Sequence, residues 1–279
     1  MLKILKPGFY TTLQDKGRFG YRNMGVPVSG CMDAVAPEKC NLLLENSASA
    51  AVLEITMTGP TAEFEEPTFI SLGGAKVEAF LNEESLELYK IYQVNKGDKI
   101  SFGKLKLGFR NYLAVKGGFT TTKTLESVSQ HHLITAEASI KANDEVPYNG
   151  NSDFSPKVSE LRIEDYLNEV TLEVFKGPEF SLLSKKQKEQ LLDSDFTVAK
   201  ENNRMAYQLE ETIEEHTHSI LTSATLPGTI QLTPNGKLIV LMRDGQTTGG
   251  YPRILQLSEK AISVLAQKRA GNKVKLKLV

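Results

Sequence analysis

Short stretches of apolar residues, separated by Gly, Pro and Asn, run along most of the chain. The pattern is clearest over residues 51–57, 69–72, 106–115 and 238–242. Stretches rich in β-branched, aromatic or alternating residues, with turn formers near their ends, are typical of strands. The chain is therefore predicted to be mainly β and built from short strands.

A first interruption of this pattern has helical spacing. Cys40, Leu43 and Leu44 recur at intervals that place them on one face of a helix. Pro37 suits an opening turn, and Asn46 is the expected stop. We therefore expect a short helix that buries this face.

Two more helices are expected in the second half of the chain. Ser184 is followed three residues later by Gln187, the arrangement of a capping box. Ser258 is the expected N-cap of the other helix, and Gly271 is its expected stop. The fold class is thus mainly β with a few helices.

Two short echoes between the halves suggest an internal duplication. Leu53–Pro60 is echoed by Leu172–Pro178, and Gly97–Ile100 by Gly271–Val274. Short repeats of this kind also arise by chance. We interpret them as traces of two related β-barrels.

The polar segment 142–153 separates the two halves. It is rich in Asn, Asp and Gly, a composition typical of a linker or a long loop. We place the boundary there, with one domain over residues 1–150 and another over residues 151–279.

Charge and cysteine content narrow the classes of function. The 279 residues include 33 Lys and Arg against 34 Asp and Glu, so no concentrated positive field favours nucleic acid or an anionic membrane. Cys31 and Cys40 are the only cysteines, too few for a four-cysteine zinc site. No apolar run approaches the roughly 18 residues of a membrane span, and the expected location is the cytoplasm.

Several familiar cofactor motifs do not occur in the chain. There is neither a Gly-x-x-x-x-Gly-Lys-Ser/Thr phosphate loop nor a Gly-x-Gly-x-x-Gly dinucleotide fingerprint. The four histidines form the pairs His131/His132 and His216/His218, neither at the spacing of helical metal ligands. No metal is predicted in this chain.

The first candidate site is the polar loop 244–253. It follows a strand that ends at Met242 and contains two glycines, which suit a close approach of backbone N–H groups to a small polar ligand. Alternatively, the loop is a turn whose Thr and Gln side chains satisfy only their own backbone.

A second polar cluster lies over residues 11–21. Asp15 and Arg18 have two possible arrangements. They pair with each other, or Arg18 binds a carboxylate while Asp15 transfers a proton. Paired structural charges are the alternative. Both clusters combine Gln, Thr, Gly and Tyr with charged residues, as a duplicated site would.

Two further carboxylates stand out. Asp33 precedes the first helix as either a helix cap or an exposed acid. Glu54 lies in an otherwise apolar strand, where an unpaired charge is costly. Glu54 is therefore expected on a solvated face or in a site.

At these motifs the chain resembles the biotin-dependent carboxyltransferase family, which includes the C subunit of 5-oxoprolinase, allophanate hydrolase subunit 2 and the carboxyltransferase part of urea carboxylase. The resemblance covers nearly the whole chain. It rests on Thr12–Arg18, Gly25–Asp33, Leu53–Glu54, Gly59–Pro60, Tyr112–Phe119, Asn203–Tyr207, Pro227–Gln231 and Gln246–Pro252. It implies two cyclophilin-like β-barrel domains and a partner protein of related fold.

The chain departs from the family pattern in one region. Where members of the family usually carry Gly-Ser-Arg-Ser-Thr, this chain has Glu126–Gln130. The Gly-Arg-x-Leu pattern that usually follows is replaced by Ala136–Ile140. The contact of the missing arginine with a substrate or an anion is therefore not expected at these positions.

The function that the resemblance implies is that of the C subunit of an ATP-dependent 5-oxoprolinase. Together with a subunit-B-like protein and the A subunit of 5-oxoprolinase it would open 5-oxoproline to glutamate, with ATP acting through the assembled complex. The expected catalytic residues are Asp15, Arg18, Gln246, Thr247 and Thr248. The expected substrate-binding residues are Gln14, Asp33, Glu54, Gln231 and Tyr251.

Two other functions remain open. One is carboxyl transfer to urea or an amide, with biotin on a separate carrier because the chain has no Ala/Val-Met-Lys-Met attachment sequence. The other is a non-enzymatic regulator that binds a subunit-B-like kinase inhibitor.

Overall fold

The computed structural model describes residues 1–279. Its contacts group the chain into two compact units. Unit 1 comprises residues 1–18 and 29–167, and unit 2 comprises residues 19–28 and 168–279. The predicted domain limits at residues 1–150 and 151–279 stay a prediction.

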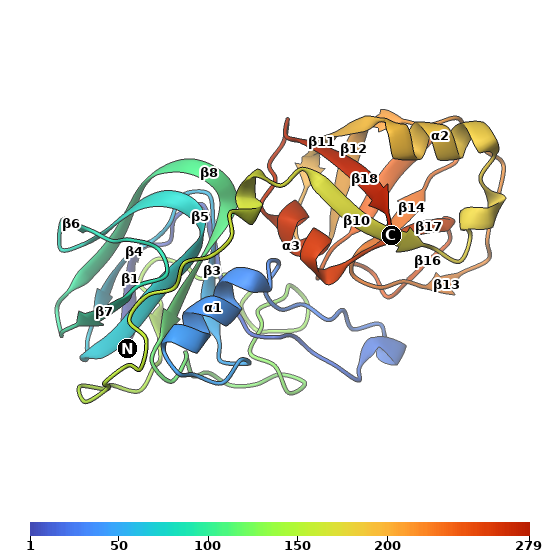
Figure 1. Ribbon diagram of the computed structural model, residues 1–279. Coiled ribbons are helices and arrows are strands. Elements are labelled where there is room, and N and C mark those ends of the chain that lie inside the picture. Colours follow the sequence, from blue (N-terminus) through green and yellow to red (C-terminus); the bar gives the residue numbers. More distant parts are fainter. The chain divides into compact units, whose positions relative to one another are not determined.

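Unit 1 is a nine-stranded sheet with one α-helix. Its strands are β1 (Leu2–Lys6), β2 (Tyr10–Gln14), β3 (Val52–Thr56), β4 (Thr61–Phe64), β5 (Thr68–Leu81), β6 (Glu84–Ser85), β7 (Ile91–Val94), β8 (Lys99–Val115) and β9 (Glu145–Val146). The main order is β2-β3-β8-β4-β1-β9, and β5 pairs with β6, β7 and β8. The sheet curls around its core (Figure 1).

The two longest strands bend sharply where they pair. Register shifts between β5 and β8 begin at Gly74, whose φ is 102°. A Cβ atom at Gly74 would lie 2.4 Å from the carbonyl oxygen of Arg110, so only glycine fits this bulge. The bend lets β8 pair with β3 and β4 as well as with β5.

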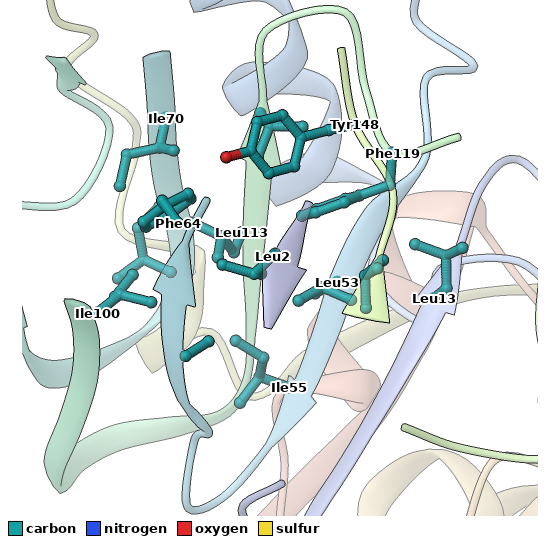
Figure 2. Close-up of a cluster of buried hydrophobic side chains, with 14 of the residues drawn as sticks. Leu2, Leu13, Leu53, Ile55, Phe64, Ile70, Ile100, Leu113, Phe119 and Tyr148 are labelled. Carbon is teal, nitrogen blue, oxygen red and sulfur yellow. The ribbon is translucent and has the colours of Figure 1, made fainter. Parts of the chain in front are cut away.

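The inner face of this sheet holds the hydrophobic core of unit 1. Leu2, Leu53, Phe64, Ile70 and Leu113 are almost completely buried there (Figure 2). Complete burial of such a side chain stabilises the fold by roughly 1.5–3 kcal/mol relative to exposure.

The segment 142–153, expected to be a linker or a long loop, contributes two residues to this core. Within it, β9 pairs with β1, and the side chains of Val146 and Tyr148 are buried. Two apolar residues spaced by two positions are enough to bring a polar segment onto a sheet edge. Apart from β9, residues 142–153 form a loop, and the domain boundary placed there stays a prediction.

Unit 2 is a closed barrel of seven strands with two α-helices and a separate two-stranded sheet. The barrel strands are β10 (Thr171–Lys176), β11 (Asp195–Asn202), β12 (Ala206–Thr212), β14 (Thr229–Leu232), β15 (Lys237–Leu241), β17 (Arg253–Leu257) and β18 (Lys273–Leu278). They close in the order β10-β17-β14-β15-β12-β11-β18, and β18 runs parallel to β10. Strands β13 (Ser223–Ala224) and β16 (Thr248–Gly249) form a separate pair.

The α-helices confirm most of the sequence prediction. Helix α1 (Val35–Leu43) buries Cys40 and Leu43, and α2 (Lys185–Asp193) begins with the complete capping box at Ser184. Helix α3 (Glu259–Ala266) has Ser258 as its N-cap.

One predicted helix end was wrong. Helix α3 ends at Ala266, five residues before Gly271, which instead has a φ of 84° just before β18. Gly97 has a φ of 91° just before β8, so both echoed glycines introduce a strand. The predicted class, mainly β with a few helices, is confirmed.

Candidate functional site

Asp15 anchors the loop 127–129 in unit 1. Its Oδ1 accepts hydrogen bonds from the hydroxyls of Ser127 and Ser129, both at 2.6 Å, and from the N–H of Gly17 at 2.8 Å. Its Oδ2 accepts from the N–H of Val128 at 2.9 Å. Several donors on one carboxylate hold the side chain in a fixed position.

Arg18 holds the same loop from another side. Its side chain is 1% exposed, its Nε donates to the carbonyl oxygen of Thr124 at 3.1 Å, and its Nη2 donates to that of Ser129. Asp15 and Arg18 therefore both bind the segment that contains Thr124 and residues 127–129. This arrangement favours a positioning role for both, and their catalytic role stays a prediction.

The anchored loop forms one wall of a cavity in unit 1. The cavity has a volume of about 660 Å³, and its lining includes Leu13, Thr124, Val128 and Gln130. Gln14 is fully buried behind it and donates to the Thr12 hydroxyl at 3.0 Å and to the carbonyl oxygen of Gln130 at 3.1 Å. The Asp15 and Arg18 contacts thus shape this wall.

The sequence did not identify the two serines that bind Asp15. Ser127 and Ser129 lie in the segment that departs from the family pattern, and both are fully buried. The only available signal was their Ser-x-Ser spacing, which puts alternate side chains on the same side of an extended segment.

Glu54 lies in a buried polar cluster of unit 1. Its side chain is 1% exposed, and its Oε2 accepts from the N–H of Met32 at 2.7 Å and from the Tyr112 hydroxyl at 3.0 Å. The Nε of Arg110 lies 3.8 Å from Oε1. Of the two expected environments, a solvated face is therefore excluded.

Asp33 lies in the same cluster, at the start of α1. Its Oδ1 accepts from the N–H of Val35 at 2.8 Å and from that of Ala36 at 3.4 Å, as a helix cap does. Its Oδ2 accepts from the Tyr166 hydroxyl. Asp33 is fully buried, so of the two alternatives the exposed acid is wrong.

Burial raises the pKa values of two groups near these carboxylates, Tyr112 and Cys40. It raises the pKa of Tyr112 well above its usual value, and Glu54 and Asp33 raise it further. It also raises the pKa of the Cys40 thiol to about 12. These groups stay protonated at neutral pH and act there as neutral hydrogen-bonding partners.

The polar loop of unit 2 has a different character. Gln246 donates from Nε2 to Oε1 of Gln231 at a long 3.4 Å. Gln231 is 1% exposed, and its own Nε2 is buried without a hydrogen-bond partner. Thr225 ties this loop to β13 by donating its hydroxyl to the carbonyl oxygen of Gln246 and its N–H to that of Thr247 at 3.0 Å.

The two glycines of this loop differ in the space around them. A Cβ atom on Gly249 would lie 2.5 Å from Nε2 of Gln231 and 3.3 Å from Nε2 of Gln246. On Gly250 the nearest atom would be 3.7 Å away, an ordinary contact. Gly249 is therefore needed for the amide of Gln231 to pack against the backbone.

The predicted site residues thus fall into two groups, one in each unit. Gln14, Asp15, Arg18, Asp33 and Glu54 belong to unit 1. Unit 2 contains Gln231, Gln246, Thr247, Thr248 and Tyr251, of which Tyr251 is 43% exposed and Thr247 9% exposed. The catalytic and substrate-binding roles of these residues stay predictions.

The structure contains no group of three or more His, Cys, Asp or Glu side chains that could hold a metal ion. None of the helices combines the length and the hydropathy that a membrane-spanning helix needs.

Comparison with known proteins identifies the family of this chain. Residues 24–278 match the family described as carboxyltransferase domain, subdomain A and B. The chain belongs to this carboxyltransferase-domain family.

Relatives within the carboxyltransferase-domain family have more than one name. The chain is 32% identical to the C subunit of 5-oxoprolinase from Escherichia coli strain K12, over 98% of this chain and 90% of that protein. It is 41% identical to urea amidolyase of Lachancea kluyveri, over 46% of this chain and 7% of that protein.

A solved structure of a larger protein shares the fold. TTHA0988 superposes with a TM-score of 0.89 at 24% identity, covering 99% of this chain. The chain spans 55% of the length of TTHA0988, about half.

Proposed function

We propose that this chain is the C subunit of an ATP-dependent 5-oxoprolinase, which acts in the cytoplasm with the A and B subunits to open 5-oxoproline to glutamate. The observation that carries the proposal is the similarity to the Escherichia coli protein, which extends over 98% of this chain and 90% of that protein. The match thus includes both units rather than a single shared domain.

The chemistry of lactam opening requires three kinds of group. A lactam is a poor electrophile until its oxygen is phosphorylated or stabilised, after which water needs a base and the developing oxyanion needs donors. In this proposal Gln246, Thr247 and Thr248 supply donors, while Asp15 and Arg18 remain the candidates for proton handling and charge.

ATP belongs to the assembled complex in this proposal. The chain has no phosphate-loop sequence, so its own residues do not fit the common nucleotide site. Activation of the lactam oxygen is therefore assigned to the other subunits.

The partner of related fold is part of the proposal. This chain spans 55% of TTHA0988. In this proposal, a separate subunit-B-like protein takes the place of the remaining part of such a longer chain. We expect the purified chain to be inactive alone and to form a stable heteromer with that partner. Size-exclusion chromatography with light scattering on the co-expressed pair tests this. Independent elution of the two proteins at micromolar concentration contradicts it.

The activity is tested in the reconstituted complex. The chain is co-expressed with its subunit-B-like partner, the A subunit is added, and 5-oxoproline-dependent ATP hydrolysis is followed. Thr247→Val removes a hydroxyl at nearly constant volume, and we expect kcat/KM to fall about tenfold or more. No 5-oxoproline-dependent hydrolysis by the wild-type complex would contradict the proposed function.

Carboxyl transfer is the second candidate. The 41% identity to the Lachancea kluyveri urea amidolyase exceeds the 32% identity to the Escherichia coli protein, although it covers only 46% of this chain. In that case biotin would arrive on a separate carrier. Transfer of a carboxyl group from a carboxylated biotin carrier to urea, without 5-oxoproline hydrolysis, would favour this alternative.

A further inference from the structure

Arg22 is an arginine of unit 2 without a carboxylate partner. It begins the short 3₁₀ helix η1 (Arg22–Met24) and donates from Nη2 to the carbonyl oxygen of Thr225. Its Nη1 is buried and has no hydrogen-bond partner. Burial lowers its pKa, and no carboxylate lies within 4.0 Å to offset this effect.

Arg22 adjoins the polar loop through a shared residue. Thr225, whose carbonyl oxygen Arg22 binds, also bonds the backbone of Gln246 and Thr247. Gln246 in turn donates to Gln231, whose own Nε2 has no hydrogen-bond partner. Two sets of unused donors, one cationic and one neutral, therefore belong to one small region of unit 2.

A neighbouring arginine shows how such a group is normally satisfied. Arg253 donates to the carbonyl oxygen of Ala224 at 2.6 Å and pairs with Glu179 at 2.7 Å and 2.9 Å. A buried donor without a partner is energetically unfavourable, and an arginine fork binds carboxylates in bidentate fashion. Arg22 lacks what Arg253 has, namely a carboxylate.

We propose that Arg22 binds the carboxylate of a small ligand whose neutral carbonyl oxygen is bound by the side-chain amides of Gln231 and Gln246. The 3.4 Å bond between these amides is long, so a ligand carbonyl replaces it at little cost.

This inference rests on the proposed function for its choice of probe, 5-oxoproline, which carries both a carboxylate and a lactam carbonyl. The matched probe is 2-pyrrolidone, the same lactam without the carboxylate. Titration calorimetry on the full chain compares the two. We expect wild type to bind 5-oxoproline at least about tenfold more tightly than 2-pyrrolidone, a difference typical of one good charged contact.

Two substitutions of Arg22 test the assignment. Arg22→Gln should weaken 5-oxoproline binding by about tenfold or more and leave 2-pyrrolidone binding unchanged. Arg22→Lys retains the charge but loses the fork and should show a smaller loss. Arg162→Gln removes a positive charge from an exposed position of unit 1 and should change neither affinity. Circular dichroism verifies that each variant is folded, and Arg22→Lys still tests the inference if Arg22→Gln does not fold.

Each possible result supports or overturns either the assignment of Arg22 or the proposed function. Equal affinity of wild type for the two lactams, or unchanged 5-oxoproline affinity in folded Arg22→Gln or Arg22→Lys, overturns the assignment of Arg22. If the assembled complex fails to hydrolyse 5-oxoproline while the chain binds it through Arg22, the proposed function falls and the site stands. If hydrolysis occurs without any role for Arg22 in binding, the site falls and the proposed function stands.

Discussion

Asp15 in unit 1 and Arg22 in unit 2 are both charged residues outside regular strands, yet their surroundings are opposite. Each oxygen of the Asp15 carboxylate accepts at least one hydrogen bond from within the chain. Arg22 retains a buried N–H group without a partner. A charged group whose hydrogen bonds are complete holds structure together, whereas one with spare donors is available to a ligand.

The same contrast separates Glu54 from Gln231. Both are 1% exposed and lie in strands. Glu54 has donors on both sides, whereas Nε2 of Gln231 has no acceptor. Two side chains with the same burial therefore differ in their hydrogen bonds, and this difference is the basis for proposing Gln231 rather than Glu54 as a ligand contact.

The largest expected effect is that of Glu54→Ala. It removes the acceptor for the N–H of Met32 and the hydroxyl of Tyr112 within a buried cluster. We expect the free energy of unfolding to fall by about 3–5 kcal/mol, measured by urea denaturation. Glu63→Ala removes a half-buried partner of Lys99 and should cost less than about 1 kcal/mol. Similar losses in both variants would contradict the structural role of Glu54.

Asp15→Asn tests whether the anchored loop is structural. The new amide group would face the hydroxyls of Ser127 and Ser129 or the N–H of Val128. We expect a loss of about 3 kcal/mol in the free energy of unfolding, because bonds to a charged acceptor are lost. An unchanged melting temperature with much reduced turnover in the complex would instead make Asp15 a catalytic residue.

Gly249→Ala tests the packing of the amide pair. Its Cβ atom would lie 2.5 Å from Nε2 of Gln231, so the amide has to move. We expect a loss of about 2 kcal/mol from overpacking, measured by thermal denaturation. Gly250→Ala is the matched control, since its Cβ atom finds only ordinary contacts. Equal melting temperatures for the two variants would show that Gln231 is not held by Gly249.

The smallest effect concerns alkaline pH and unit 1. The pKa of the Cys40 thiol is about 12 in the fold and near its ordinary value of 9.0 when unfolded. Below pH 9 the thiol is protonated in both states, and its contribution to stability is complete. Above that pH the unfolded thiol ionises first, so the free energy of unfolding falls by about 1.4 kcal/mol between pH 8 and pH 10.

Cys40→Ala isolates this contribution from those of the buried tyrosines. Urea denaturation at pH 8 and pH 10 should show a smaller decrease with pH for Cys40→Ala than for wild type. Parallel decreases in the two proteins would show that the Cys40 thiol ionises freely in the fold.

The sequence by itself determined the class of fold and most helix starts. Alternating and apolar runs predicted the positions of β3, β5, β8 and β15, and side-chain caps predicted the starts of α2 and α3. These features depend on residues within a few positions of each other, so local spacing is sufficient to predict them. The sequence also pointed to Asp15, Arg18, Gln231 and Gln246 as unusual polar residues.

Only the tertiary structure decided which of these residues have complete hydrogen bonds. Ser127, Val128 and Ser129, which donate to the Asp15 carboxylate, lie more than 100 positions away along the chain, and Arg22 reaches Thr225 across 203 positions. Likewise, the pairing of β9 with β1 converts an apparent linker into part of a core. Hydrogen bonds between residues so distant in sequence depend on how strands pair and bulge, and no local pattern of residue types encodes that information.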